Sequence, residues 1–188
     1  MKGKDIKEII KTALSLFFIC AVTAGLLAGI NAVTAPAIEK NNLQKADETR
    51  RTVFPEATSF EQASAPDGTA YYIALKDSQK TGYVFTTCAK GYGGEIEVMT
   101  GINTDGTISR VSILSINETP GLGMKAKNES FLNQYNGKSG KLSVIKNGST
   151  SENEIDAITS ATVSSVAVTN AVNEALEMYN SIISGQEE

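Results

Sequence analysis

The chain has 188 residues, a formal net charge of −4 and no histidine. A net negative charge disfavours nucleic acid as a partner. The lack of histidine excludes Ser-His-Asp and Cys-His catalysis and removes the most common transition-metal ligand. The two cysteines lie far apart in the sequence, so a Cys-rich metal site is not expected either. We therefore expect neither a metal site nor catalytic side chains, and any redox chemistry would need an organic cofactor.

Residues 12–33 form a run of 22 residues without a charge, most of them apolar. As a helix this run would measure about 33 Å, close to the ~30 Å hydrocarbon core of a bilayer. A cleaved signal peptide is the alternative, but its apolar region is only about 7–15 residues long. The length therefore favours an uncleaved transmembrane helix.

The flanking charges bear on the orientation of this helix. Four lysines precede it, and further basic residues follow its far end: Lys2, Lys4, Lys7 and Lys11, then Lys40, Lys45, Arg50 and Arg51. Because long domains are translocated largely regardless of charge, the short N-terminal flank counts more. We predict a single-pass protein of the cytoplasmic membrane, with a cytoplasmic N-terminus and an extracytoplasmic C-terminal domain.

The segment after the span is polar and has the composition of a helix, particularly over residues 38–51. Pro36 is expected to end or bend the span. Residues 58–68 contain turn chemistry and are expected to be a loop. The predicted division is residues 1–35 for the N-terminus and transmembrane helix, 36–68 for a helical connector and 69–188 for the domain.

The remainder of the chain predicts strands followed by a packing helix. Residues 69–75 and 83–89 have strand composition, and residues 95–103 and 107–116 flank a hairpin signal at Thr104-Asp105-Gly106. A short helix is predicted over 128–135, a strand over 142–145 and a long helix over 162–183. The candidate core residues of the hairpin are Ile96, Val98, Met99, Ile108, Val111, Ile113 and Leu114. This order predicts an α+β domain with an antiparallel sheet closed by a C-terminal helix.

Two glycine-bearing loops follow predicted strands: Lys-Gly-Tyr-Gly-Gly at 90–94 and Glu-Thr-Pro-Gly-Leu-Gly at 118–123. Glycine allows a backbone to turn sharply and to approach a flat ligand closely. Leu122 is the one apolar side chain of the second loop. It can either fill the core or lie against a ligand ring.

The segment Asp-Ala-Ile-Thr-Ser-Ala-Thr, residues 156–162, precedes the last predicted helix. Thr162 falls in its first turn, where backbone N–H groups lack partners and the helix dipole favours an anion. Thr159, Ser160 and Thr162 can therefore be simple helix caps. Alternatively, a hydroxyl there can carry a phosphate group.

The segment 156–162 resembles the flavinylation motif of the FMN-binding domain family, with Ser160 at a position where that family usually has Gly. Both glycine loops and an N-terminal membrane helix occur in the same order and at similar spacing. The whole chain is similar to the G subunits of the Rnf electron-transport complex, the ion-translocating ferredoxin:NAD⁺ oxidoreductase. Two alternatives remain open: the C subunit of the Na⁺-translocating NADH:quinone reductase, and a flavin-free, membrane-anchored binding module.

The resemblance implies that Thr162 carries FMN through a phosphoester bond, formed by a Mg²⁺-dependent flavin transferase that uses FAD as donor. It implies an electron carrier whose partners are the other subunits of the Rnf complex. The candidate ribityl and phosphate contacts are Thr159, Ser160 and Ala161. The candidate ring contacts are Thr119, Leu122 and Gly123, with Tyr92 and Gly93 behind them. Asp156 is expected to be recognised by the transferase or to orient the loop, a plain helix cap being its alternative.

Overall fold

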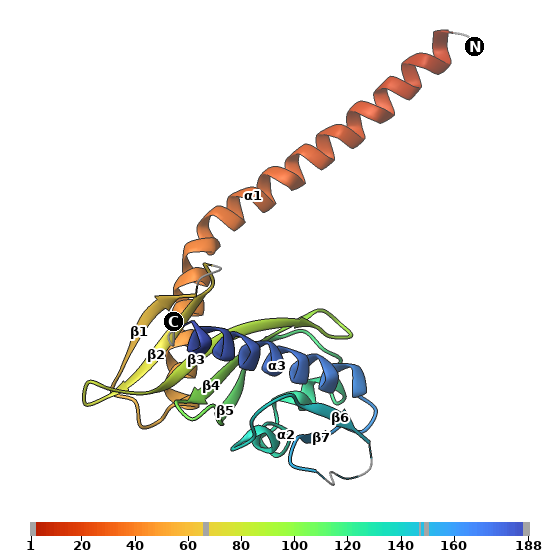
Figure 1. The fold of residues 1–188 in the computed structure, drawn as a ribbon. Helices are drawn as coiled ribbons and strands as arrows, with labels where there is room; N and C mark the ends of the chain where they lie inside the picture. The colour runs from red at the N-terminus through yellow and green to blue at the C-terminus, as the bar shows by residue number, and fades with distance from the viewer. Residues whose placement is uncertain (1–2, 66–67, 147, 149–150, 186–188) are drawn as a thin grey trace. The chain divides into compact units, whose positions relative to one another are not determined.

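The computed structural model describes residues 3–65, 68–146, 148 and 151–185 (Figure 1). Its contacts divide the chain into two compact units, Met1–Gln44 and Lys45–Glu188. The first helix, α1 (Gly3–Val53), crosses this division.

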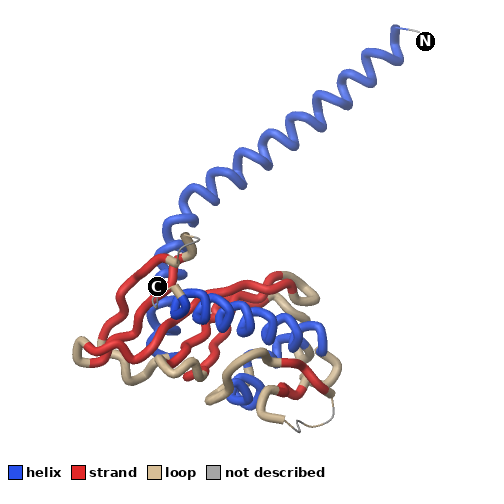
Figure 2. Tube along the Cα trace, viewed as in Figure 1, coloured by secondary structure: helices blue, strands red, loops and turns tan. Residues whose placement is uncertain are grey.

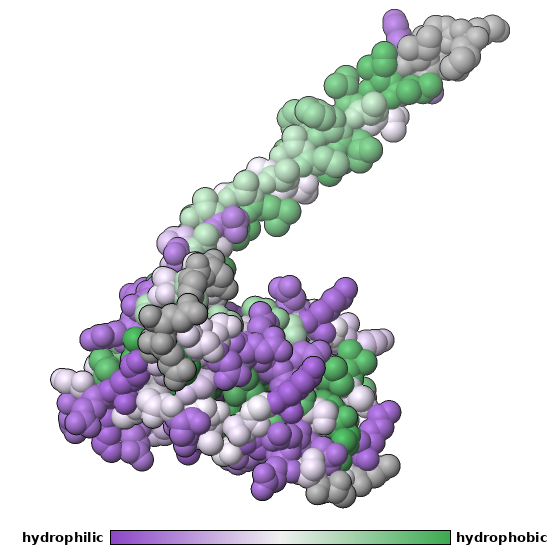
Figure 3. All heavy atoms as spheres, in the orientation of Figure 1, coloured by the Kyte–Doolittle hydropathy of each residue, from purple (hydrophilic) through white to green (hydrophobic). Residues whose placement is uncertain are grey.

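The part of α1 in the first unit is a regular helix whose apolar side chains are exposed. Among the described residues it is the one helix that is long and apolar enough to cross a membrane, judged by length and composition. In Figure 3 most of this segment is coloured green, the colour of hydrophobic residues. The helix continues through Pro36, which therefore does not end it. A proline costs a helix one internal hydrogen bond, and the strong helix formers that follow maintain the helix beyond it.

The second unit is built on an antiparallel sheet in which the strands follow chain order (Figure 2). The strands are β1 (Ser59–Ser64), β2 (Ala70–Lys76), β3 (Gln79–Lys90), β4 (Glu95–Asn103) and β5 (Ile108–Ile116). The predicted β4–β5 hairpin is confirmed, and Gly106 adopts a φ of 83° in its turn. The expectation of a loop over 58–68 is wrong over β1. This strand pairs with β2 through its backbone, which a polar sequence does not prevent at the edge of a sheet.

A smaller layer follows the sheet. It contains the 3₁₀ segments η1 (Gly123–Lys127) and η2 (Asn133–Tyr135), the short helix α2 (Glu129–Leu132) and the parallel pair β6 (Ser143–Ile145) and β7 (Glu154–Asp156). The chain then enters α3 (Thr162–Ser184), which lies across the sheet in Figure 1. The predicted α+β fold, an antiparallel sheet closed by a C-terminal helix, is confirmed.

The sheet has an apolar core on each face. On one face α3 contributes Val168, Val172 and Leu176 to a cluster that includes Phe85 and Val98. All seven core residues predicted for the hairpin are buried, and most of them belong to this cluster. Met99 and Leu114 belong instead to a second cluster.

The second cluster is formed with the end of α1 and the turn after it, through Val53, Phe54 and Ala57. Phe54 lies over two glycines of the sheet: a Cβ added at Gly101 would come within 2.9 Å of its ring, and one at Gly82 would clash with it. The Ser109 hydroxyl donates to the Val53 carbonyl at 3.0 Å. The segment from Lys45 onward, which the sequence assigned to a connector, is therefore packed into the folded unit.

Candidate functional site

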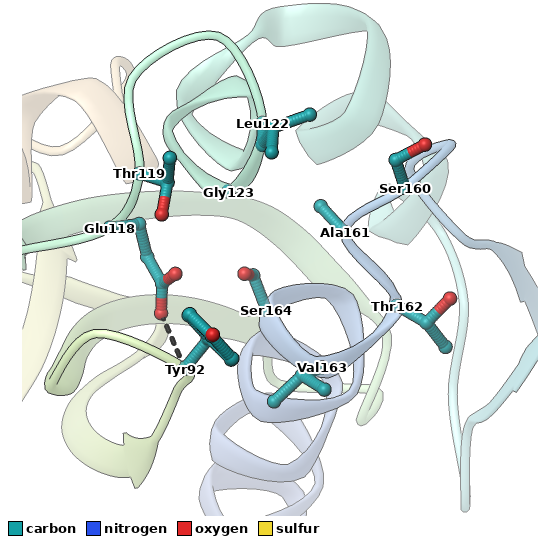
Figure 4. Close-up of a pocket in the computed structure, with 10 residues that line it drawn as sticks. All are labelled: Tyr92, Glu118, Thr119, Leu122, Gly123, Ser160, Ala161, Thr162, Val163 and Ser164. Atoms are coloured by element: carbon teal, nitrogen blue, oxygen red, sulfur yellow. Dashed lines mark hydrogen bonds between the residues drawn. The ribbon is translucent and has the colours of Figure 1, made fainter.

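A pocket of about 600 Å³ lies where three loops meet at the start of α3 (Figure 4). A volume of this size is typical of cofactor sites. Seven of the nine predicted site residues line it: Tyr92, Thr119, Leu122, Gly123, Ser160, Ala161 and Thr162. In the view of Figure 4, Tyr92 and Thr119 lie at one side, and Ser160 and Thr162 lie at the other. The fold thus brings together residues that are up to 70 positions apart in the sequence (162 − 92 = 70).

The two remaining predicted residues do not line this pocket. Thr159 is exposed on the loop before α3. Gly93 follows Tyr92 in the same loop, and its backbone N–H donates to a carboxylate oxygen of Glu118 at 3.2 Å.

The loop before α3 is held in a defined turn. The Ala161 N–H donates to the Ile158 carbonyl at 2.9 Å. The Ser165 hydroxyl accepts from the Ile158 N–H at 2.9 Å and donates to the Ala161 carbonyl at 3.0 Å. Ser160, at the tip of this turn, adopts a φ of 65°, a left-handed conformation that glycine adopts most easily. Through these two hydrogen bonds Ser165 holds the turn that precedes Thr162.

Helix α3 begins at Thr162 with Ala161 as its N-cap residue, and no side chain caps it among the described residues. The interpretation of Thr159, Ser160 and Thr162 as helix caps is therefore wrong. The first intrahelical bond runs from the Ser165 N–H to the Ala161 carbonyl at 3.0 Å. The N–H groups of the three preceding residues lie before that bond, and the first turn contains no acidic side chain.

Apolar side chains around the pocket are unusually exposed. Tyr92 is 78% exposed and Leu122 is 41% exposed, and Val163 and Val166 of α3 are exposed as well. The interpretation of Leu122 as a core residue is therefore wrong. Tyr92, Leu122 and Val163 line the cavity and leave apolar surface open, which is typical of a site that an apolar, planar ligand covers.

Comparisons with known proteins agree with this geometry. Residues 91–177 match the FMN-binding domain family, and residues 1–53 match the RnfG N-terminal region. The chain is 40% identical to the G subunit of the Na(+)-translocating ferredoxin:NAD(+) oxidoreductase complex of Acetobacterium woodii, over 95% of both chains. It is 33% identical to the G subunit of the proton-translocating ferredoxin:NAD(+) oxidoreductase complex of Clostridium ljungdahlii, over 98% of this chain and 99% of that protein.

The chain belongs to the RnfG family. Its fold also resembles the crystal structure of the C subunit of the Na(+)-translocating NADH-quinone reductase from Parabacteroides distasonis. That likeness has a TM-score of 0.53 at 23% identity, and it covers 60% of this chain and 61% of that chain. The similarity along the whole chain decides between the two complexes in favour of the Rnf family.

Asp156 of the family motif lies outside the pocket and orients the segment that leads to it. Its carboxylate accepts from the Gly148 N–H at 2.9 Å. Its backbone N–H donates to Gln134 Oε1 at 2.8 Å, and Gln134 Nε2 donates back to its carbonyl at 3.3 Å. Asp156 precedes α3 by six residues and does not cap it, so its alternative role as a helix cap is wrong.

Three pocket residues were not predicted: Glu118, Val163 and Ser164. Glu118 is only 7% exposed, and Ser164 is 2% exposed. Glu118 is the first residue of the second glycine loop and lies two residues after the end of β5. This position is the one feature of the sequence that could have marked it as a site residue. Its burial depends on a loop 26 residues earlier in the chain, which no local pattern reveals.

Proposed function

We propose that this chain is the electron-carrying subunit of a membrane-bound, ion-translocating ferredoxin:NAD⁺ oxidoreductase, and that FMN is attached to it through a phosphoester bond to Thr162 Oγ. One observation carries the proposal. Thr162 is the first residue of α3 and lines a pocket of about 600 Å³, together with six other residues expected to contact FMN.

The Thr162 end of the pocket suits a phosphate group. The N–H groups of Thr162, Val163 and Ser164 precede the first intrahelical hydrogen bond, and no side chain of the described residues caps them. A 23-residue helix adds a dipole whose positive end lies at this point. Here Thr162 would supply the covalent oxygen, and Ser160 and Ala161 would contact the phosphate and ribityl chain.

The opposite end of the pocket suits the ring. Tyr92 and Leu122 would provide apolar contact area, and Thr119 would offer a hydroxyl to the polar edge of the ring. FMN supplies the one- and two-electron chemistry when it is bound. The protein's residues hold and orient it, partly exclude water and set the charge around it. No acid or base of the chain is needed for these tasks.

The attachment reaction balances with FAD as the flavin donor. The Thr162 hydroxyl oxygen would form a bond to the phosphorus on the FMN side, the pyrophosphate bond would break, and AMP would leave with the bridging oxygen. The hydroxyl proton would pass to the transferase or to solvent. The Thr162 side chain is partly exposed, and no described side chain or backbone group is seen to bond its hydroxyl, so a transferase can reach it.

The same proposal assigns the protein to the cytoplasmic membrane, with its sheet domain on the extracytoplasmic side. The apolar part of α1 supports one membrane crossing, and the lysines before it support a cytoplasmic N-terminus. Its partners would be the other subunits of the complex, and a flavin transferase during maturation.

In-gel fluorescence tests the covalent site. The full chain would be produced with an active flavin transferase, denatured and examined under ultraviolet light. We expect a fluorescent band for the wild type, none for Thr162→Ala, and a normal band for Thr52→Ala, which removes an exposed hydroxyl outside both the motif and the pocket. A dark wild-type band, with the transferase active on another target, would contradict the proposal. So would a fluorescent Thr162→Ala band.

A further inference from the structure

Glu118 is a buried carboxylate at the point where both glycine loops meet. It follows β5 and is 7% exposed. Its Oε1 accepts the backbone N–H of Tyr92 at 2.7 Å, the dashed line in Figure 4. It also accepts the backbone N–H of Gly93 at 3.2 Å. Among the described residues no lysine or arginine forms an ion pair with it. Both of these hydrogen bonds come from backbone N–H donors, and the carboxylate oxygen accepts them.

The glycines of both loops make room for this side chain. A Cβ added at Gly91 would clash with Glu118 Oε1. In the other loop, a Cβ at Gly123 would lie 2.6 Å from Glu118 Oε2 and 2.6 Å from Ser164 Oγ. The same carboxylate therefore lies against the backbone of two glycines that are 32 residues apart (123 − 91 = 32).

The two carboxylate oxygens have different surroundings. Oε1 is occupied by the loop that carries Tyr92, which otherwise projects into solvent. Oε2 lies near Gly123 and Ser164, both of which line the pocket, and the Ser164 hydroxyl points toward Glu118 in Figure 4. One oxygen can thus hold the wall of the pocket while the other brings negative charge to its interior.

We propose that Glu118 is a positioning residue of the flavin site: it fastens the Tyr92 loop to the end of β5, and its charge keeps the reduction potential of the bound flavin low. The second part rests on the proposed function. A fixed negative charge in a partly desolvated site opposes the addition of electrons to a neighbouring ring. Neither part requires Glu118 to exchange a proton.

Hydrogen exchange tests the fastening without any flavin. The full chain would be purified in detergent in its unloaded form, and exchange would be followed at residues 91–94. In Glu118→Ala we expect the Tyr92 and Gly93 amides to exchange about tenfold faster or more, because hydrogen bonds to a charged acceptor are lost. Glu118→Gln retains a carbonyl acceptor and should give an intermediate rate. Unchanged exchange in Glu118→Ala, in a protein that remains folded, would overturn the fastening role.

Redox titration of the FMN-loaded chain tests the charge. We expect Glu118→Gln to shift the flavin midpoint potential to a more positive value, since the shape of the side chain is kept and its charge is removed. Glu129→Gln is the matched control: it removes the same charge from an exposed side chain that does not line the pocket, and it should leave the potential unchanged. An unshifted potential in Glu118→Gln, or an equal shift in both variants, would overturn the charge role. A wild type without covalent flavin would instead contradict the proposed function, and the exchange result would still stand.

Discussion

Replacing Ser160 with glycine should stabilise the protein. Ser160 has a φ of 65°, in the left-handed region where a Cβ meets the following carbonyl. That conformation costs an L-residue roughly 1–2 kcal/mol, while glycine adds about 0.5–1 kcal/mol of unfolded-state entropy that must be lost on folding. The expected net gain for Ser160→Gly is about 0.5–1 kcal/mol in the free energy of unfolding. For a unit of this size, that corresponds to a rise in Tm of roughly 1–4 °C.

The chain contains a matched control for this change. Ser78, in the two-residue turn between β2 and β3, has a φ of 67° and lies outside the pocket. Ser78→Gly removes the same hydroxymethyl group from the same backbone conformation, so its gain in stability should be similar. Ser160→Ala retains the Cβ and its strain, and it should give no gain. All three variants would be compared with the wild type by urea unfolding of the full chain in detergent, followed by circular dichroism.

Flavin loading checks whether Ser160→Gly leaves the proposed attachment site intact. The pocket keeps its other residues in Ser160→Gly, and the relaxed turn still leads into Thr162, so covalent loading should be retained at the wild-type level. Stabilisation by Ser78→Gly with none by Ser160→Gly would refute the strain argument. It would show that the Ser160 side chain contributes interactions that offset its backbone cost.

Two further predictions concern the body of the domain. Phe54→Ala should lower the free energy of unfolding by about 3–5 kcal/mol, because the ring fills the space over Gly82 and Gly101; urea unfolding would measure it, and a loss below about 1 kcal/mol would contradict this packing. Burial raises the pKa of Tyr135 above its usual range, against a smaller opposing effect of its bond to Thr169. The protonated Tyr135 hydroxyl therefore makes its full contribution to the free energy of unfolding below the unfolded pKa of about 10. That contribution is lost as the pH rises above this value. Tyr135→Phe should weaken this alkaline loss, and an unchanged pH profile of unfolding would argue against it.

Much of the fold follows from local patterns. The β4–β5 hairpin is encoded by Thr104-Asp105-Gly106, and Gly106 supplies the positive φ that its turn needs. The start of α3 at Thr162 follows from the change from a polar loop to helical periodicity. By contrast, β1 has a polar sequence and depends on pairing with β2, so composition could not identify it.

Some residues of the candidate site could be found from local motifs, and others depend on contacts between segments distant in sequence. The motif at 156–162 identified Thr162, and the glycine loops identified Leu122 and Tyr92. The burial of Glu118 depends on the loop at 90–94, which is distant in sequence, as well as on Gly123 of its own loop. Ser164 occupies a helical position whose orientation toward the pocket is set by the packing of α3 on the sheet. A sequence can suggest such residues only after the partners around them are known.

One face of the sheet packs against α3, and the other packs against the end of α1. A pull on α1 would reach the sheet first through Lys45, which donates to the Leu114 carbonyl, then through Arg50, which lies over the Tyr72 ring. Val53 and Phe54, packed in the apolar cluster below, come after them. The turn before Thr162 is held by Ser165 of α3. The buried side chains of α3 pack on the opposite face of the sheet. The contacts of α1 and the helix that begins at the proposed attachment residue thus lie on opposite faces of the sheet. Changes in the length of the anchor before Lys45 are therefore expected to leave the proposed flavin site unaltered.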